Sequence, residues 1–123
     1  MSPTPRVERI DHVQLAMPPG AEDRATAFYE GILGIPRVPK PPELEARGGC
    51  WFERAALRVH LGVEGDFRPA RKAHPALAVT GIDDLFRLLE VAGHPVRRTE
   101  DVPGTPQWYV DDPFGNRIEF LPA

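Results

Sequence analysis

The sequence contains one cysteine, Cys50, among its 123 residues, so no intrachain disulfide is available to it. A chain of this size without disulfides is typical of a reducing compartment, and we expect a cytoplasmic protein. Apolar runs stay far shorter than a membrane span, and the opening residues lack the apolar core of a signal peptide. The sequence therefore excludes a disulfide-stapled scaffold and predicts no membrane partner.

Basic stripes and arginine-rich tails are also missing, and the net charge is only −3, so we expect no nucleic-acid partner. The sequence has no G-x-S-x-G elbow, phosphate loop, dinucleotide fingerprint or C-x-x-C pair. Its hydrophobic fraction of 41% and charged fraction of 27% are those of an ordinary soluble globular protein. The length fits one domain spanning residues 1–123.

The sequence does contain an internal repeat. The segment "HVQLAM" (12–17) resembles "HPALAV" (74–79), and each predicts a strand. A stripe of apolar residues then predicts helices over 21–33 and 83–92, the second with Leu85, Leu88, Leu89 and Ala92 on one face.

The ends of these helices support the repeat. Gly34 and Gly93 follow them in matching Gly-x-Pro phrases and suit left-handed caps, while Asp83 is the expected N-cap of the second helix. Module one covers about 7–64 and module two about 73–122. Each reads as a strand, a helix and two or three further strands, which makes the fold α+β. Coincidence between two unrelated halves is the alternative.

Two further segments extend the match between the halves. The aromatic strand "CWF" (50–52) aligns with "QWY" (107–109), and "RVHL" (58–61) aligns with "RIEF" (117–120). Ile118 and Phe120 are expected to face the helix.

Alternation along the predicted strands gathers four metal-binding side chains on the face away from the helices. They are His12, His60, His74 and Glu119, with His12 the twin of His74 and His60 the twin of Glu119. Three neutral imidazoles and one carboxylate suit a divalent ion such as Zn, Ni, Co, Mn or Fe. Each residue alone also has a structural interpretation. His60 is the weakest ligand candidate of the four. The alternative is that it lies beside the metal without binding it, or that it faces the substrate.

Six other residues are candidates for substrate binding. Arg58 and Arg117 are twins that either hold a carboxylate or phosphate, or form ion pairs at the cavity rim. Aromatic residues of the two aligned strands either line a pocket or belong to the core, and Gln14 shares the face of His12. The candidate set is Gln14, Arg58, Arg117, Trp51, Trp108 and Tyr109. Cys50 is expected to be buried rather than nucleophilic.

Together, these residues and the closing phrase "DPFGNRIEF" (112–120) resemble the vicinal oxygen chelate superfamily, which includes glyoxalase I, extradiol dioxygenases and bleomycin-resistance proteins. The resemblance covers nearly the whole chain. It implies two βαβββ modules in a pseudo-twofold repeat, with curved mixed sheets enclosing a cavity and helices outside. It also implies that His12, His74 and Glu119 are the recurrent His, His, Glu ligands. His60 stands where glyoxalase I usually carries Glu or Gln.

The resulting functional hypothesis is a divalent-metal-dependent enzyme of lyase or isomerase type. It would act on a small oxygenated metabolite through a metal-chelated enolate or alkoxide, because a divalent cation stabilises developing negative charge. Glu119 or His60 would serve as the general base. The alternatives are a protein that sequesters a small molecule such as an antibiotic, and an Fe(II) extradiol-type dioxygenase.

The resemblance also predicts a homodimer. The metal site then either forms across two chains, with His12 and His60 facing the partner's His74 and Glu119, or closes within one chain.

Overall fold

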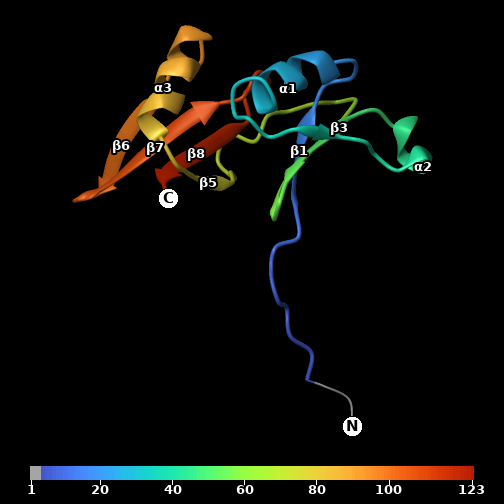
Figure 1. Ribbon diagram of the computed structural model, residues 1–123, viewed down its shortest axis with the longest axis horizontal. Coiled ribbons are helices and arrows are strands. Elements are labelled where there is room, and N and C mark those ends of the chain that lie inside the picture. Colours follow the sequence, from blue (N-terminus) through green and yellow to red (C-terminus); the bar gives the residue numbers. More distant parts are fainter. Residues whose placement is uncertain (1–3) are drawn as a thin grey trace.

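A computed structural model describes residues 4–123, which form two four-stranded mixed sheets lying side by side (Figure 1). The first sheet has the order β1-β4-β3-β2, and the second has the order β5-β8-β7-β6. In chain order, the strands are β1 (Val13–Met17), β2 (Arg37–Val38), β3 (Cys50–Arg54), β4 (Leu57–Val63), β5 (Ala76–Val79), β6 (Arg97–Val102), β7 (Thr105–Asp111) and β8 (Arg117–Pro122). The expected α+β class and repeated βαβββ order are confirmed, and the sheets are curved but not closed.

The pairing of strands shows how closely the two sheets correspond. β1 runs parallel to β4 with Gln14 opposite His60, and β5 runs parallel to β8 with Ala76 opposite Glu119. The register therefore makes His60 the structural counterpart of Glu119. By the same spacing, His12 corresponds to His74, two residues before Gln14 and Ala76.

The register corrects one pair in the sequence repeat. Trp51 pairs with His60, whereas the residue that pairs with Glu119 is Tyr109. The structural counterpart of Trp51 is thus Tyr109, one position beyond Trp108, with which the sequence letters align it. A shift of one residue moves a side chain to the opposite face of a sheet, so this correction decides which aromatic faces the histidines.

Helix α1 (Glu22–Tyr29) is shorter than the expected span 21–33. After Tyr29, the amide of Gly31 bonds to the carbonyl of Thr26, five residues back, which interrupts the regular i→i−4 ladder, although the amides of Ile32 and Gly34 again bond four residues back. A Cβ at Gly31 would lie 2.4 Å from the carbonyl oxygen of Ala27, which explains why glycine stands at this turn. Gly34 and Gly93 are both left-handed, with φ of +73° and +87°, but only Gly93 directly follows the C-cap of its helix, because α1 already ends at Tyr29. A short helix, α2 (Pro42–Glu45), lies in the proline-rich loop.

Helix α3 (Ile82–Val91) begins one residue before the predicted start. Its N-cap is Gly81, with φ of 75°, so the expectation of an Asp83 cap is wrong. The predicted apolar face is only partly buried. Leu89 is fully buried, whereas Leu88 is 57% exposed and Ala92 is also exposed, because α3 contacts its sheet mainly along β8.

The two modules share one core and are joined by the turn 111–116. The hydroxyl of Tyr29 in α1 donates to Asp112 Oδ2 at 2.7 Å, and both groups are buried. Asn116 Nδ2 donates to the carbonyl of Ala16 in β1 at 2.8 Å. Burial raises the pKa of the Tyr29 phenol well above its ordinary value, and the neighbouring Asp112 carboxylate raises it further. Ile118 and Phe120 are buried in the same core, as expected.

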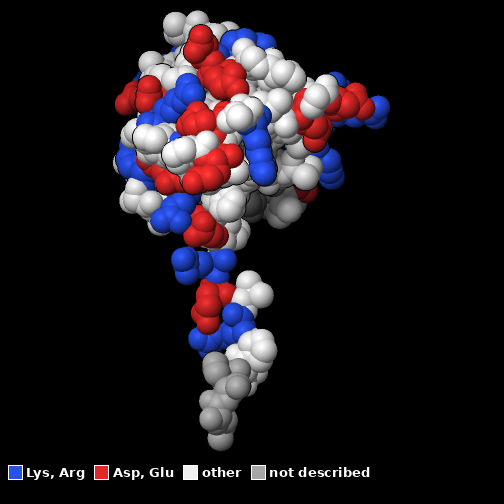
Figure 2. Space-filling view, turned by 90° about the vertical axis from the view of Figure 1, so that its right-hand side faces the viewer, with Lys and Arg blue, Asp and Glu red and all other residues white. Residues whose placement is uncertain are grey.

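The segment before β1, residues 4–12, extends away from the body of the molecule (Figures 1 and 2). Its two large apolar side chains contact little of the chain, since Val7 is 96% exposed and Ile10 is 79% exposed. Charged residues lie on either side of them, so the segment is an amphipathic arm at whose base His12 is found. No helix within residues 4–123 has the length and apolarity needed to cross a membrane.

Candidate metal centre

In module one, three aromatic rings stack on the face of the sheet away from α1. The ring of His60 lies between Trp51 and His12, with centroid distances of 4.1 Å and 4.5 Å. Trp51 is brought there by its pairing with His60 across β3 and β4, since directly opposite residues share a face. His60 is only 5% exposed as a result, so it is not a solvent-facing strand residue.

Carboxylates fix both histidines of this stack. His60 Nε2 lies 2.7 Å from Glu53 Oε2, and His12 Nδ1 lies 3.1 Å from Asp11 Oδ2. The hydrogen bond from His12 lowers the pKa of Asp11, and the guanidinium of Arg58, 2.8 Å away, lowers it further. Because ionised Asp11 can only accept, His12 carries its proton on Nδ1 and leaves the Nε2 lone pair open.

In module two, the equivalent pair is His74 and Glu119. His74 Nδ1 lies 2.8 Å from the carbonyl oxygen of Lys72, and its Nε2 lies 3.0 Å from Glu119 Oε1. A carbonyl oxygen only accepts, so the proton must be on Nδ1 and a neutral His74 turns its Nε2 lone pair toward the carboxylate. Two lone pairs at this distance repel unless a cation lies between them, either a proton or a metal ion.

The residues therefore fit a divalent metal by the chemistry of their donors. His12 and His74 both donate Nδ1–H to an oxygen and present Nε2, which is the arrangement typical of metal-bound histidine. Glu119 adds an oxygen donor beside the second of them. His60 differs, because the Nε2 of this ring is already bonded to Glu53 and only Nδ1 remains.

Within one chain, however, the four predicted ligands form two separate pairs. Among residues 4–123, no three His, Cys, Asp or Glu side chains are grouped so that they could hold one metal ion. The structure brings His12 to His60 and His74 to Glu119, and the pairs belong to different sheets.

The remaining candidates occupy distinct environments. Tyr109 packs edge-on to His74 at 5.3 Å, and Arg117 lies over the Tyr109 ring at 4.9 Å. Trp108 instead contacts Phe86 of α3 at 5.9 Å, so it lies on the helix face, which agrees with the core alternative for the aromatic residues and not with a pocket-lining role. Buried Cys50 confirms the prediction of a structural thiol, and burial raises its pKa to about 11.

Gln14 borders a small cavity next to the stacked rings. The cavity has a volume of about 180 Å³ and extends from Gln14 and Trp51 to the proline-rich loop. Gly62 forms part of its wall, where a Cβ would meet Gln14 Nε2 at 2.5 Å. The loop residues that line the cavity are Lys40, Leu44, Arg47 and Gly48.

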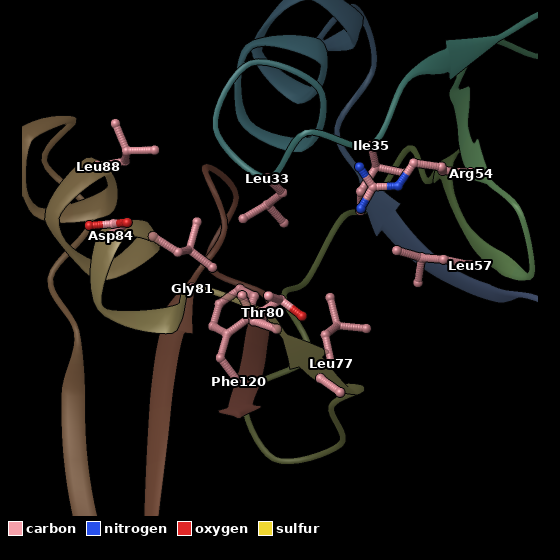
Figure 3. A pocket seen from close by; sticks show the side chains of 13 residues that line it. Leu33, Ile35, Arg54, Leu57, Leu77, Thr80, Gly81, Asp84, Leu88 and Phe120 are labelled. Atoms are coloured by element: carbon pink, nitrogen blue, oxygen red, sulfur yellow. The ribbon is translucent and has the colours of Figure 1, made fainter. Parts of the chain in front are cut away.

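A larger cleft lies between the modules and is separate from these histidines (Figure 3). Its volume is about 430 Å³, and its walls are mostly apolar, with Leu33 and Ile35 on one side and Leu77 and Phe120 on the other. Its ionisable lining residues are Arg54 and Asp84 alone, so it offers no donor set for a metal.

Sequence reasoning missed two residues of the site, Asp11 and Glu53. Asp11 directly precedes His12, and the register of β3 and β4 places Glu53 on the face of Trp51. Alternation along "CWFER" (50–54) places Glu53 on that face as well, so a signal was present.

The chain is similar to known proteins over nearly its whole length. The family described as "Glyoxalase/Bleomycin resistance protein/Dioxygenase superfamily" matches residues 9–120. A structure from Bacillus anthracis, described as that of a glyoxalase family protein, is 46% identical with a TM-score of 0.87, and the match covers 95% of this chain and 96% of that one. No curated protein matches the sequence.

Two more distant structures share the fold. The fosfomycin resistance protein FosX from Listeria monocytogenes is 15% identical with a TM-score of 0.74, and the match covers 96% of this chain and 95% of that one. Lactoylglutathione lyase from Agrobacterium tumefaciens is 20% identical with a TM-score of 0.64, covering 88% and 90% of the two chains. FosX has also been solved in complex with Mn(II) and sulfate.

Proposed function

The chain belongs to the glyoxalase/bleomycin resistance protein/dioxygenase superfamily, and from this premise we propose that it is a divalent-metal-dependent enzyme of lyase or isomerase type acting on a small oxygenated metabolite. One observation carries the proposal: His74 Nε2 and Glu119 Oε1 face each other at 3.0 Å while His74 Nδ1 is bonded to a carbonyl. A neutral histidine and an ionised carboxylate keep this geometry only by sharing a cation. A metal bound there would supply Lewis-acid stabilisation of negative charge on substrate oxygens.

The proposed ligand set combines two chains of a homodimer. His74 and Glu119 of one protomer would be completed by the partner's His12, whose Nε2 is open and whose side chain is 44% exposed in the single chain. The amphipathic arm next to His12 supports this assembly, because burying Val7 and Ile10 against a second copy would be favourable.

His60 is the proposed proton acceptor in this site. Its Nε2 is held by Glu53, so Nδ1 keeps the lone pair, and the stacked Trp51 and His12 rings fix the plane of the imidazole. Glu53 acts through His60 as a positioning residue. In this arrangement, Glu119 holds the metal, and its own role as a general base is the alternative.

The experiment that tests the assembly measures bound metal in defined heterodimers. Chains carrying His12→Ala and Glu119→Gln are given different tags, co-expressed, and the mixed dimer is isolated and titrated with Mn²⁺ by calorimetry. If each site takes His12 from one chain and Glu119 from the other, one site keeps both ligands and the second loses both. We expect about one strongly bound ion per mixed dimer, against about two in the wild-type dimer and none in either single-variant dimer.

Other stoichiometries would contradict parts of the proposal. A mixed dimer without tightly bound metal would show that each site forms within one chain. Wild-type protein that binds no divalent ion would remove the enzymatic proposal and favour a protein that sequesters a small molecule. For the proton acceptor, His60→Gln should keep Mn²⁺ affinity within about tenfold while losing turnover, whereas Glu119→Gln should lose both.

A further inference from the structure

The two twin arginines of the repeat differ in one respect. In module one, Arg58 is paired with Asp11 at 2.8 Å. In module two, Arg117 forms no ion pair with any residue of the described chain, 4–123. The register explains this difference, because the position equivalent to Asp11 is occupied by Ala73. The counterpart of Asp11 is therefore missing from module two, and Asp111, which lies opposite Arg117 across β7 and β8, pairs with Arg97 at 3.0 Å instead.

Arg117 is held in place although it lacks a counter-ion. Its guanidinium lies over the Tyr109 ring at 4.9 Å, and its backbone amide bonds to the carbonyl of Ala70. Its Nε is buried and has no hydrogen-bond partner among residues 4–123. Leaving a charged donor buried without a partner is unfavourable, so the guanidinium is short of acceptors, and its two terminal N–H groups are the ones from which one oxyanion could accept.

The location of Arg117 relates it to the candidate metal centre. It lies two residues before Glu119 on the same strand, and alternation places both on the same face, about 6–7 Å apart along β8. Tyr109 contacts His74 as well as Arg117, so one aromatic ring joins the cation to the metal-binding pair. Ala76 and Ala78 are small and exposed on the neighbouring strand, which leaves room above this face.

We propose that Arg117 binds an oxyanion group of the substrate, so that the enzyme acts on small metabolites carrying a carboxylate or phosphate in addition to their metal-chelating oxygen pair. This inference rests on the proposed metal site, and it specifies the substrate class of that site. Arg58 has no such role, because Asp11 neutralises it.

The test compares pairs of 2-hydroxy acids that differ in a second anionic group. Malate is compared with 2-hydroxybutyrate, and 3-phosphoglycerate with glycerate, by calorimetric titration of the Mn²⁺-loaded protein. Wild-type protein should prefer the member with the extra anion by about tenfold or more, the effect of one charge-assisted contact. The size of the preference within each pair shows whether Arg117 binds a carboxylate or a phosphate more tightly.

Two matched variants assign this preference to one residue. Arg117→Gln should abolish it while leaving Mn²⁺ affinity and the affinity for 2-hydroxybutyrate unchanged. Arg58→Gln removes an equal charge at the twin position and should retain the preference. Equal loss in both variants, or no preference in the wild type, would overturn the proposal. The proposal would also be overturned if Arg117→Gln lost the preference only because the dimer dissociates.

The metal and the oxyanion can be tested separately. Binding of malate is also measured in chelator-treated protein, where Arg117 should still favour malate over 2-hydroxybutyrate although both bind more weakly. If no metal binds but this preference persists, the proposed function fails while the oxyanion site stands. If metal binds normally without the preference, only the oxyanion site is wrong.

Discussion

Module one and module two present equivalent faces but use them differently. In module one, His60 is enclosed by two rings, Glu53 accepts from it, and Arg58 is neutralised by Asp11. In module two, His74 Nε2 and Glu119 Oε1 face each other at 3.0 Å with a cation required between them, and Arg117 forms no ion pair among residues 4–123. The same backbone register thus supports one module in which His60 and Arg58 are already paired and one in which His74, Glu119 and Arg117 require added charge.

This contrast suggests different roles for the two modules of the duplicated fold. The cluster whose hydrogen bonds are complete can position a ring and move a proton, since its geometry is fixed before any ligand arrives. The incomplete cluster has donors and acceptors left over, and these bind ligands. The following predictions alter one module at a time.

The largest expected effect is on metal affinity. Glu119→Gln should weaken Mn²⁺ binding by about 100-fold or more, because it removes an anionic oxygen donor beside His74. Glu53→Gln, the matched change in module one, should alter Mn²⁺ affinity by less than about tenfold. Calorimetric titration measures both, and comparable losses would mean that Glu53 is itself a ligand.

The second effect concerns the contact that joins the modules. Tyr29→Phe leaves buried Asp112 without one of its donors and should lower the free energy of unfolding by about 1–3 kcal/mol. Tyr109→Phe is the control, because no hydrogen bond from its hydroxyl is found within residues 4–123, and it should change stability by less than about 0.5 kcal/mol. Urea unfolding measures both variants, and equal stabilities would show that the Tyr29 bond contributes nothing.

A third change makes module two resemble module one. Ala73→Asp introduces a carboxylate at the position equivalent to Asp11, where it should pair with Arg117 as Asp11 pairs with Arg58. The preference for malate over 2-hydroxybutyrate should then fall by about tenfold. The control Ala73→Asn has nearly the same shape without the charge and should keep the preference. Equal behaviour of the two variants would contradict electrostatic pairing.

The smallest expected effect is on the stability of the protein at alkaline pH. The pKa of Cys50 is raised by burial from 9.0 to about 11, so the folded state favours the neutral thiol. A group whose pKa is raised on folding contributes its stability below pH 9, and this contribution is lost as the pH rises toward 11. Melting temperatures measured from pH 8 to pH 11 should therefore decline. The slope should be shallower in Cys50→Ala, and an unchanged slope would assign the decline to other groups such as Tyr29.

The sequence predicted the architecture well because local signals agreed with one another. Alternation placed Ile118 and Phe120 in the core, and Gly93 marked the left-handed end of α3. Three departures remained, and two of them had long-range causes. Helix α1 ended early at the close approach of Gly31 to Ala27, and Leu88 stayed exposed because α3 contacts only part of its sheet. The position of Trp108 followed from strand register, which letter-by-letter alignment of the halves does not determine.

The candidate site was predictable only in part. Alternation of side chains along the strands placed four residues on one face, namely His12, His60, His74 and Glu119. In the structure, His12 lies next to His60 and His74 lies next to Glu119. Nothing in the residue pattern indicated that the ring of His60 would be enclosed, since stacking depends on the distance between β1 and β3 across β4. The grouping of four ligands around one ion stays a prediction, because it depends on a second chain.

The bonds from Tyr29 to Asp112 and from Asn116 to Ala16 bridge 83 and 100 residues of sequence. A nascent chain therefore cannot satisfy the buried phenol of α1 until the turn at 111–116 has left the ribosome. Contacts this distant in sequence slow folding, since the entropic cost of closing the loop comes before the free energy gained from the contact. The first half therefore emerges with an unfinished interior, so slow translation between the halves should expose its apolar surface and favour aggregation.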